Sequence, residues 1–244
     1  MRSSGGGRGI GRILALALAE AGADVTVASR KLENCSAVAD EISKTMGRAA
    51  YPSVLDITDP KSINELVGSV RDRFGRIDIL VNNSGSTWGA PFEEMPLEKW
   101  EQVIRTNLTG TFLMSQAVVP VMKQKAWGRI INVSSIVGLV APPSFMSTVG
   151  YTASKGGIIS LTRELAVKLA GDNIVVNAIA PSFFPTRMTS AFVQKFGDQI
   201  RGSNPMKRLG EEDDLKGVTV FLASQASSYV TGQVIVVDGG YTAT

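Results

Sequence analysis

The sequence predicts an α/β fold of three layers, in which a doubly wound parallel sheet is covered by helices on both faces. Short apolar runs rich in β-branched residues recur along the chain, and such runs are typical of strands that are buried on both sides. These runs cover residues 24–28, 77–81, 129–133, 174–179 and 234–237. Amphipathic stretches separate them, which gives the strand–helix alternation of a parallel sheet with right-handed crossovers. No repeat or linker divides the chain, so we expect one domain over residues 1–244.

The stretches between the apolar runs carry helical periodicity and helix-start signals. The expected helices cover residues 10–21, 35–46, 60–74, 98–125, 151–170 and 211–222. Thr58 and Asp59 stand before Pro60, and this order is typical of a helix N-terminus. Residues 49–54 are a weaker strand candidate, and Pro52 within them cannot donate an amide hydrogen bond, so we expect this strand at an edge of the sheet.

Composition excludes several classes of function. The 244 residues are 44% hydrophobic and 19% charged, as in a globular protein, and the formal charge of +3 comes without any run of Lys or Arg. We therefore expect no nucleic-acid partner. Histidine is absent, which excludes Ser-His-Asp and Cys-His catalysis and most zinc sites, and we expect no metal. Acid–base chemistry must then come from Tyr, Lys, Asp, Glu or Cys with shifted pKa values.

The single cysteine and the start of the chain bear on location. Cys35 has no partner for an internal disulfide, as expected in a reducing compartment. Residues 1–11 are too short and too rich in glycine for a secretory signal, and no apolar run is long enough to span a membrane. We expect a cytoplasmic protein without a membrane partner. Only residues 1–4 precede the glycine-rich segment, whereas a strand takes about 5–6 residues, so we expect a truncated first strand and a reading frame that extends upstream of Met1.

A glycine-rich segment, Gly5 to Gly11, leads directly into the first expected helix. Its glycines permit a tight turn and a close approach to a pyrophosphate, which the helix N-terminus stabilises; the alternative is a disordered glycine-rich end. About twenty residues later the next strand ends in Ser29 and Arg30, where an NAD-specific site usually has an acid. Arg30 and Arg8 could instead bind a 2′-phosphate, although each alone could be an ordinary surface cation. We therefore expect NADP(H), with NAD(H) the weaker alternative.

Tyr151 and Lys155 provide a candidate acid–base pair. Their spacing of four residues places them on one face of a helix, one turn apart. A free tyrosine titrates at about 10, and a neighbouring ammonium group together with an oxidised nicotinamide would lower that pKa. Tyr151 is then a credible proton donor for a ketone. The alternative is a tyrosine and a lysine at a helix start with no special role.

Polar residues follow the strands that precede this helix. Ser134 and Ser135 end the strand at 129–133, and a hydroxyl there can stabilise charge on a substrate oxygen; a structural turn is the alternative for Ser134. Asn82 to Gly85 follow the strand at 77–81. Asn107 interrupts an apolar helical pattern and is either a satisfied core residue or one that positions a water near Lys155.

Taken together, these motifs resemble the short-chain dehydrogenase/reductase family. The resemblance runs from Ser4 to Gly240 and comprises, in order, Gly5-x3-Gly9-x-Gly11, Asn82-Asn83-Ser84-Gly85, Ser135, Tyr151-x3-Lys155 and Pro181-x4-Thr186. Ser84 stands where the family usually has Ala, Ser182 where it has Gly, and Ser4 where it has Thr. The family has a Rossmann-type domain with seven parallel strands and is commonly tetrameric, so the resemblance implies a homotetramer or homodimer.

The same resemblance implies roles for individual residues. It makes Tyr151 the catalytic acid/base, and it assigns Lys155 to lowering the Tyr pKa and holding the nicotinamide ribose. Ser135 would bind the substrate carbonyl, and Asn107 would maintain a proton relay. The cofactor would be lined by Gly5, Gly7, Arg8, Gly9, Ile10, Gly11, Ser29, Arg30, Asp56, Ile57, Asn83, Tyr151, Lys155, Pro181 and Thr186. For Asp56, which would meet the adenine, a helix-entry acid before Thr58 is an equally good interpretation.

Residues 182–209 would form the substrate lid. Phe183, Phe184, Met188 and Phe192 could hold an acyl chain, Arg187, Lys195 and Arg201 could bind an acid group, and both sets could equally be the faces of a surface helix. Short stretches of the sequence resemble gluconate 5-dehydrogenase-like members most, which favours a keto-sugar acid such as 5-ketogluconate as the substrate. The alternatives are a 3-oxoacyl-thioester reductase and a non-catalytic NADP(H)-binding protein on the same fold.

Overall fold

A seven-stranded parallel sheet forms the centre of the computed structural model, which describes residues 2–4, 6–144, 146–186 and 188–244. Its strands are β1 (Arg2–Ser4), β2 (Val25–Ser29), β3 (Ala50–Val54), β4 (Ile79–Asn82), β5 (Gly128–Val133), β6 (Ile174–Pro181) and β7 (Val234–Val237). They lie in the order β3-β2-β1-β4-β5-β6-β7, and each neighbouring pair is parallel. The order reverses between β1 and β4, and in such sheets ligands bind beyond the carboxyl ends of the strands at this reversal. The predicted doubly wound parallel sheet is confirmed.

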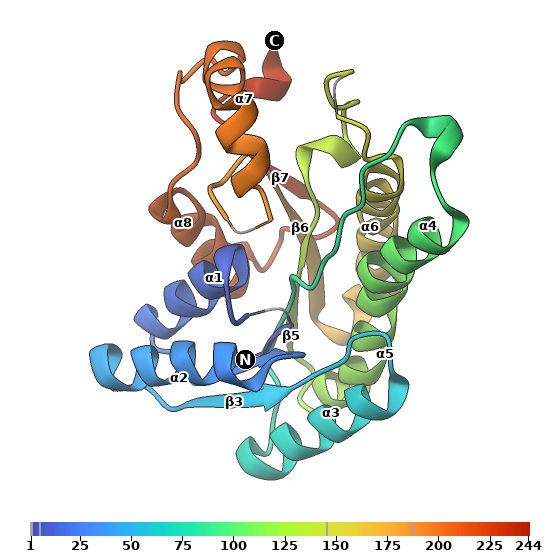
Figure 1. The fold of residues 1–244 in the computed structure, drawn as a ribbon. Coiled ribbons are helices and arrows are strands. Elements are labelled where there is room, and N and C mark those ends of the chain that lie inside the picture. The colour runs from blue at the N-terminus through green and yellow to red at the C-terminus, as the bar shows by residue number, and fades with distance from the viewer. Residues whose placement is uncertain (1, 5, 145, 187) are drawn as a thin grey trace.

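Helices cover both faces of the sheet (Figure 1). They are α1 (Gly9–Glu20), α2 (Leu32–Met46), α3 (Pro60–Phe74), α4 (Leu97–Ile104), α5 (Gly110–Lys123), α6 (Val149–Leu169), α7 (Ser190–Ser203) and α8 (Glu212–Ala223). Buried residues of α1, α2 and α8 pack on one face, and those of α3, α5 and α6 pack on the other. The three predicted layers are therefore present.

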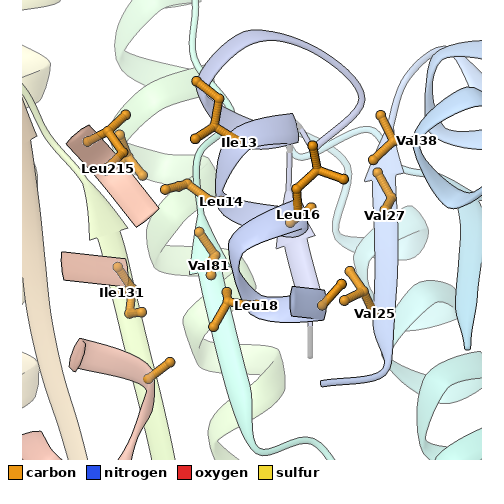
Figure 2. Packing of buried hydrophobic residues seen from close by; sticks show 14 of the residues in the cluster. Ile13, Leu14, Leu16, Leu18, Val25, Val27, Val38, Val81, Ile131 and Leu215 are labelled. Atoms are coloured by element: carbon orange, nitrogen blue, oxygen red, sulfur yellow. The ribbon is translucent and has the colours of Figure 1, made fainter. Parts of the chain in front are cut away.

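The two cores meet the sheet through alternating residues of the same strands. In β4, Val81 belongs to the α1 side and Leu80 to the α5 side, and in β5 the same division separates Ile131 from Ile130. Figure 2 shows the first of these cores, where Leu14 of α1 lies toward Leu215 of α8, and Leu16 lies toward Val27 of β2 and Val38 of α2. Strands buried on both faces need continuous apolar sequence, which is why these runs were recognisable.

The edges and the centre of the sheet agree with the sequence. Pro52 lies in β3, the edge strand beyond β2, and is exposed. The central strand β1 has three residues, and these pair with Thr26–Ala28 of β2 and Leu80–Asn82 of β4. The first strand is thus short, as expected, and it pairs on both sides.

One predicted helix is wrong in its continuity. Residues 98–125 do not form one helix, because α4 and α5 are separated by the π-helical turn Arg105–Thr109. The turn contains Asn107, whose side chain accepts a hydrogen bond from Ser86 in a distant segment. Gly110 follows the turn, and an added Cβ there would lie 2.7 Å from Cγ1 of Ile57. The helix α7 was expected only as an alternative interpretation of the lid.

Within the described ranges, every helix is too short or too polar to pass through a lipid bilayer.

Candidate active site

Tyr151 and Lys155 lie in the first turns of α6, and the structure brings their side chains together. The Nζ atom of Lys155 lies 5.4 Å from the centre of the Tyr151 ring, so the prediction that the two share a helix face is confirmed. Lys155 is 3% exposed, and its Nζ donates to the carbonyl oxygen of Val133 at the end of β5, at 2.7 Å. This bond fixes the ammonium group below the carboxyl end of the sheet.

Ser135 is the second hydroxyl of the site, and it lies near enough to the Tyr151 hydroxyl to favour the phenolate and lower its pKa. It precedes the 3₁₀ turn Ile136–Gly138, and its Oγ accepts from the Val137 N–H and donates to the Pro181 carbonyl, both at 3.4 Å. These bonds are long for hydrogen bonds, so the hydroxyl can turn toward a better partner.

Ser134 has a structural role. Its Oγ donates to the backbone carbonyl of Lys155 at 2.8 Å, and the side chain is 2% exposed. This agrees with the interpretation of Ser134 as a structural residue, and it leaves Ser135 as the hydroxyl that faces Tyr151.

Burial shifts the pKa values of the pair. It raises the pKa of Tyr151 to about 12, and the nearby Ser135 hydroxyl opposes this rise. It also lowers the pKa of Lys155 to about 8. Desolvation disfavours the charged form of each group and so sets the direction of both shifts in the protein without a cofactor. That Lys155, with an oxidised nicotinamide, lowers the Tyr151 pKa stays a prediction.

Asn107 is fully buried, and its side chain joins two segments around the catalytic helix. Its Oδ1 accepts from the Ser86 N–H at 2.8 Å, and its Nδ2 donates to the Ser86 carbonyl at 3.0 Å and to Ser154 Oγ at 2.9 Å. Ser154 Oγ in turn donates to the backbone carbonyl of Tyr151 at 2.7 Å. Asn107 thus positions α6 against the segment after β4, and its role in a proton relay stays a prediction.

Sequence reasoning missed three residues that shape this site. Ser154 lies inside the Tyr151-x3-Lys155 motif, but a serine in a helix carries no signal of the bond it makes. Gly85 lies beside Lys155, since an added Cβ would be 3.6 Å from Asn107 Oδ1 and 4.0 Å from Lys155 Nζ. Gly138 packs on α6, where its Cβ would be 2.7 Å from the carbonyl carbon of Lys155. Glycine in a short polar loop could have suggested such close approaches.

The glycine-rich segment turns sharply between β1 and α1. An added Cβ on Gly7 would lie 2.8 Å from Cβ of Asn34, and Gly9 has a φ of +51°, a conformation that favours glycine. No side chain caps the start of α1, and its first turn holds no acidic residue. The first N–H groups of α1, from Gly9 to Gly11, therefore form a site suited to an anion. Gly5 lies outside the described residues.

Thr186 lies against this turn, although it comes from the segment after β6. Its Cγ2 would be 3.1 Å from a Cβ on Gly9, and its Oγ1 lies 3.1 Å from the Oγ1 of Thr189. Pro181 ends β6, and its carbonyl oxygen accepts from Ser135. The structure therefore brings the predicted cofactor residues of the glycine-rich segment and of the β6 end to one edge of the sheet.

Two exposed arginines flank the same edge. Arg8 immediately precedes α1, and Arg30 directly follows β2, where no acid is present. Ser29 turns its hydroxyl to the Lys31 carbonyl and to the Cys35 thiol, at 3.1 and 3.0 Å. The guanidinium groups, more than the Ser29 hydroxyl, are thus available for a phosphate.

Three further cofactor candidates have structural partners. Asp56 Oδ1 accepts from the N–H and the hydroxyl of Thr58, and these bonds, with a smaller effect of Arg30, hold the pKa of its carboxyl below the usual value. Ile57 is buried against Gly110. Ile10 and Asn83 are half-buried, the former at the start of α1 and the latter just after β4. Contacts of these residues with a cofactor stay predictions.

The lid begins with an aromatic stack. Phe183 and Phe184 are buried, and the ring of Phe192 on α7 lies parallel to that of Phe183, with centres 5.7 Å apart. Of the basic candidates, Arg201 pairs with Asp198 on α7, and Lys195 lies over the Phe196 ring. Met188 is half exposed, and Arg187 lies outside the described residues. Most of these side chains therefore have packing or surface roles.

Groups of three or more potential metal ligands are absent from the part of the chain that the structure describes. The site consists of hydroxyl groups, one buried amine and a loop suited to a dinucleotide phosphate.

Comparisons with known proteins match the chain over nearly its whole length. Residues 5–242 match the family model described as enoyl-(acyl carrier protein) reductase. The 3-oxoacyl-[acyl-carrier-protein] reductase FabG of Thermotoga maritima is 42% identical over 237 residues, which are 97% of this chain and 95% of that protein. The corresponding FabG of Aquifex aeolicus is 39% identical over 97% of this chain and 94% of that protein.

A solved structure extends the match to three dimensions. The gluconate 5-dehydrogenase from Burkholderia cenocepacia, in complex with NADP and tartrate, has a TM-score of 0.93 and 36% identity, covering 100% of this chain and 95% of that one. The whole-length matches agree with a resemblance that runs along nearly the whole chain. The protein belongs to the short-chain dehydrogenase/reductase family of oxidoreductases.

Proposed function

We propose that the protein reduces a ketone to a secondary alcohol with NADPH, and that Tyr151 supplies the proton. One observation carries this proposal: the hydroxyl groups of Ser135 and Tyr151 lie near each other, next to the buried amine of Lys155. A carbonyl oxygen placed between the two hydroxyls would accept hydrogen bonds from both. Negative charge that develops on that oxygen would then be stabilised in a site that excludes water.

The residues at the edge of the sheet fit a dinucleotide. The uncapped start of α1 and the positive φ of Gly9 suit a pyrophosphate, and Lys155 lies close enough to Tyr151 to bind a ribose hydroxyl beside it. When bound there, the nicotinamide supplies the hydride. The protein orients the substrate through Ser135 and transfers the proton from the Tyr151 hydroxyl.

The pKa of Tyr151 suits this direction of reaction. At about 12 it keeps the phenol protonated at neutral pH, so the group is ready to donate. After donation, a protonated Lys155 would stabilise the phenolate by Coulomb attraction. In the direction of alcohol oxidation, Tyr151 would have to start as the phenolate, and burial opposes that state.

Arg8 and Arg30 favour NADPH over NADH. Both are exposed at the edge where the glycine-rich segment meets the end of β2, and Ser29-Arg30 stands where an acid would bind the ribose hydroxyls of NAD. Guanidinium groups bind phosphates through paired, charge-assisted hydrogen bonds. The Burkholderia gluconate 5-dehydrogenase structure contains NADP, which supports the same choice.

The substrate that we propose is a 3-oxoacyl thioester. Apolar side chains are exposed on three segments that follow the strands of the active-site edge: Trp88 after β4, Leu139 and Val140 after β5, and Met188 after β6. An acyl chain would cover such surface. The FabG relatives carry the name of this activity, at about 40% identity over most of both chains. This choice of substrate differs from the one that short stretches of the sequence favoured, which was a keto-sugar acid.

A keto-sugar acid is the second candidate, and the gluconate 5-dehydrogenase structure with NADP and tartrate favours it. Such a substrate needs a cation for its carboxylate. In α7, however, Arg201 and Lys195 have partners on their own helix. A non-catalytic NADP(H)-binding protein is disfavoured because Ser135, Tyr151 and Lys155 are all present and assembled.

A steady-state assay of NADPH consumption tests the proposal. The purified protein would be given acetoacetyl and longer 3-oxoacyl thioesters in one series, and 5-ketogluconate and related keto acids in another. We expect higher kcat/KM for the thioesters. Turnover of the keto acids alone would transfer the proposal to the second candidate. Tight NADPH binding without turnover of any ketone in a broad panel would overturn the catalytic assignment.

A further inference from the structure

The segment between β4 and α4 runs along the start of the catalytic helix. Its beginning lies beside Lys155, as the close approach of Gly85 to that amine shows. Its continuation lies beside Ser147, since the Ala90 N–H donates to the Ser147 carbonyl at 3.1 Å, and a Cβ on Gly89 would lie 3.2 Å from the same oxygen. In Figure 1 this segment passes beside α6 before it reaches α4.

Trp88 lies between these two anchors, and 43% of its surface is exposed. The Nζ of Lys99, on α4, lies 4.9 Å from the centre of its ring. A cation at this distance from an indole face is attracted to it, so Lys99 limits the orientations that the ring can adopt. A large apolar ring thus lies on a segment that contacts Lys155 at one end and Ser147 at the other, and much of its surface remains in contact with water.

The segment that follows the neighbouring strand β5 also exposes apolar side chains. Leu139 and Val140 directly follow the 3₁₀ turn that begins after Ser135, and they are 41% and 37% exposed. The close contact of Gly138 with the backbone of Lys155 fixes the start of this segment against α6. Trp88 and this pair therefore belong to two segments that both contact the first turns of α6.

We propose that Trp88 forms a wall for the acyl chain of the substrate and sets the preference for chain length. The proposal rests on the proposed function, since it assumes a 3-oxoacyl thioester in the active site. Acetoacetyl substrates would end before they reach the indole, whereas longer chains would cover its exposed surface. Each methylene group removed from water adds to binding, so kcat/KM would rise with chain length until the wall is covered.

The experiment measures kcat/KM with NADPH for a series of thioesters from acetoacetyl to 3-oxododecanoyl, all on the same short thiol. Three proteins are compared: the wild type, Trp88→Ala, and Tyr229→Ala. Tyr229 is a fully exposed aromatic residue that precedes β7, at the amino end of that strand and therefore at the edge opposite the active site. Its replacement controls for the loss of an exposed ring. We expect Trp88→Ala to lower kcat/KM for the longest chain by about tenfold relative to acetoacetyl, which corresponds to about 1.4 kcal/mol. Tyr229→Ala should keep the wild-type profile.

The possible outcomes separate this inference from the function on which it rests. A wild type that reduces no 3-oxoacyl thioester contradicts the proposed function itself. If the wild type reduces these thioesters and Trp88→Ala shows the same dependence of kcat/KM on chain length, the role of Trp88 is contradicted while the proposed function stands. Thermal unfolding and the Kd for NADPH are measured for each variant. A Trp88→Leu variant that regains part of the preference for long chains would show that apolar surface at this position determines the preference.

Discussion

Burial acts on Tyr151 and Lys155 in opposite directions along the pH scale, and both shifts favour the uncharged group. The pKa of the phenol rises to about 12, and that of the amine falls to about 8. At neutral pH the phenol is therefore protonated, while a modest change in surroundings decides the charge of the amine. This combination suits a site that donates a proton and then needs a positive charge beside the resulting anion.

Tyr151→Phe should abolish most of the ketone reduction. The substitution removes the proton donor and keeps the ring, so kcat should fall by about 10²–10⁴-fold, the range typical for loss of an acid–base catalyst. The Kd for NADPH, measured by quenching of protein fluorescence, should change by less than about threefold, since the hydroxyl is one contact among many. A variant that reduces the best ketone at nearly the wild-type rate would contradict the assigned role.

Lys155 should also make stability depend on pH. Its pKa in the folded protein, about 8, is below its usual value of 10.5, so the unfolded chain binds more protons between these values. The destabilisation caused by Lys155 is therefore complete below about pH 8 and disappears as the pH rises toward 10.5.

Urea unfolding of the wild type and of Lys155→Met tests this dependence. From about pH 8 to about pH 10, the free energy of unfolding of the wild type should increase relative to that of the variant, by at most about 3 kcal/mol. Above about pH 10, Tyr151 acts with the opposite sign, because its raised pKa favours the folded state only while the phenol stays protonated. Parallel curves for the two proteins would show that Lys155 titrates normally.

Arg30→Ala should weaken NADPH binding selectively. Loss of a charge-assisted bond to the phosphate costs about 1.5–3 kcal/mol, so KM for NADPH should rise by at least about tenfold. KM for NADH should stay nearly unchanged. Arg71→Ala is the matched control, since Arg71 is an exposed arginine of α3 that pairs only with its neighbour Asp72 among the described ion pairs. Equal losses for both cofactors would contradict the proposed 2′-phosphate contact.

At the residue scale, the sequence was informative where chemistry and spacing coincide. The four-residue interval between Tyr151 and Lys155 predicted their proximity, because helix geometry is fixed by local bonds. The direction of the Tyr151 pKa shift could not be predicted, since desolvation depends on which other elements cover the helix. The bond from Asn107 to Ser154 spans 47 positions and has no local signal for the same reason.

At the scale of elements, the contact between the turn after β5 and helix α6 depends on Gly138. A Cβ at this position would lie 2.7 and 2.8 Å from the backbone C and O atoms of Lys155, and backbone atoms cannot move aside as a flexible side chain can. Any shift that relieves the contact must move Ser135 relative to Tyr151. The turn thus couples packing to the geometry of the catalytic hydroxyls.

Gly138→Ala should therefore reduce both stability and activity. Overpacking of this kind costs about 1–3 kcal/mol, so the free energy of unfolding in urea should fall by that amount and kcat should decrease as well. Gly68→Ala is the control, because Gly68 lies within α3 with no atom within 4 Å of an added Cβ; it should stabilise the protein by about 0.5–1 kcal/mol. Equal stability for Gly138→Ala and the wild type would show that the turn adjusts freely.

The helices illustrate what local patterns can and cannot specify. The start and end of α3 were predicted at Pro60 and Phe74, where Asp59 caps the helix and accepts from the Lys61 N–H, and where Gly75 ends it with a φ of +67°. These signals act within a few residues. The π-helical turn at Arg105–Thr109 was missed, because Asn107 interrupts the apolar pattern there but only its distant partners explain the extra residue.

For the whole molecule, alternation of strands and helices was sufficient to predict the parallel sheet and its three layers. Pro52 also predicted that β3 lies at an edge of the sheet, as it does. The number of seven strands came from the family resemblance, and their order was not predicted, because pairing between β1 and β4 joins residues almost eighty positions apart. Long-range pairing of this kind is decided by packing of the complete set of helices and strands rather than by any segment.

The three-residue ladder of β1 has a consequence for how the sheet opens. In the described residues, β1 pairs with β2 and β4 over three positions each, whereas β5 and β6 pair over six. Amide hydrogens of Ala28 and Val81, which lie on the β1 sides of their strands, should therefore exchange with deuterium sooner than those of Ile130 and Asn177, which lie between β5 and β6. The sheet would then open first at the β1 ladders, in its middle. This opening would separate the glycine-rich segment from the half of the sheet that carries Ser135, Tyr151 and Lys155.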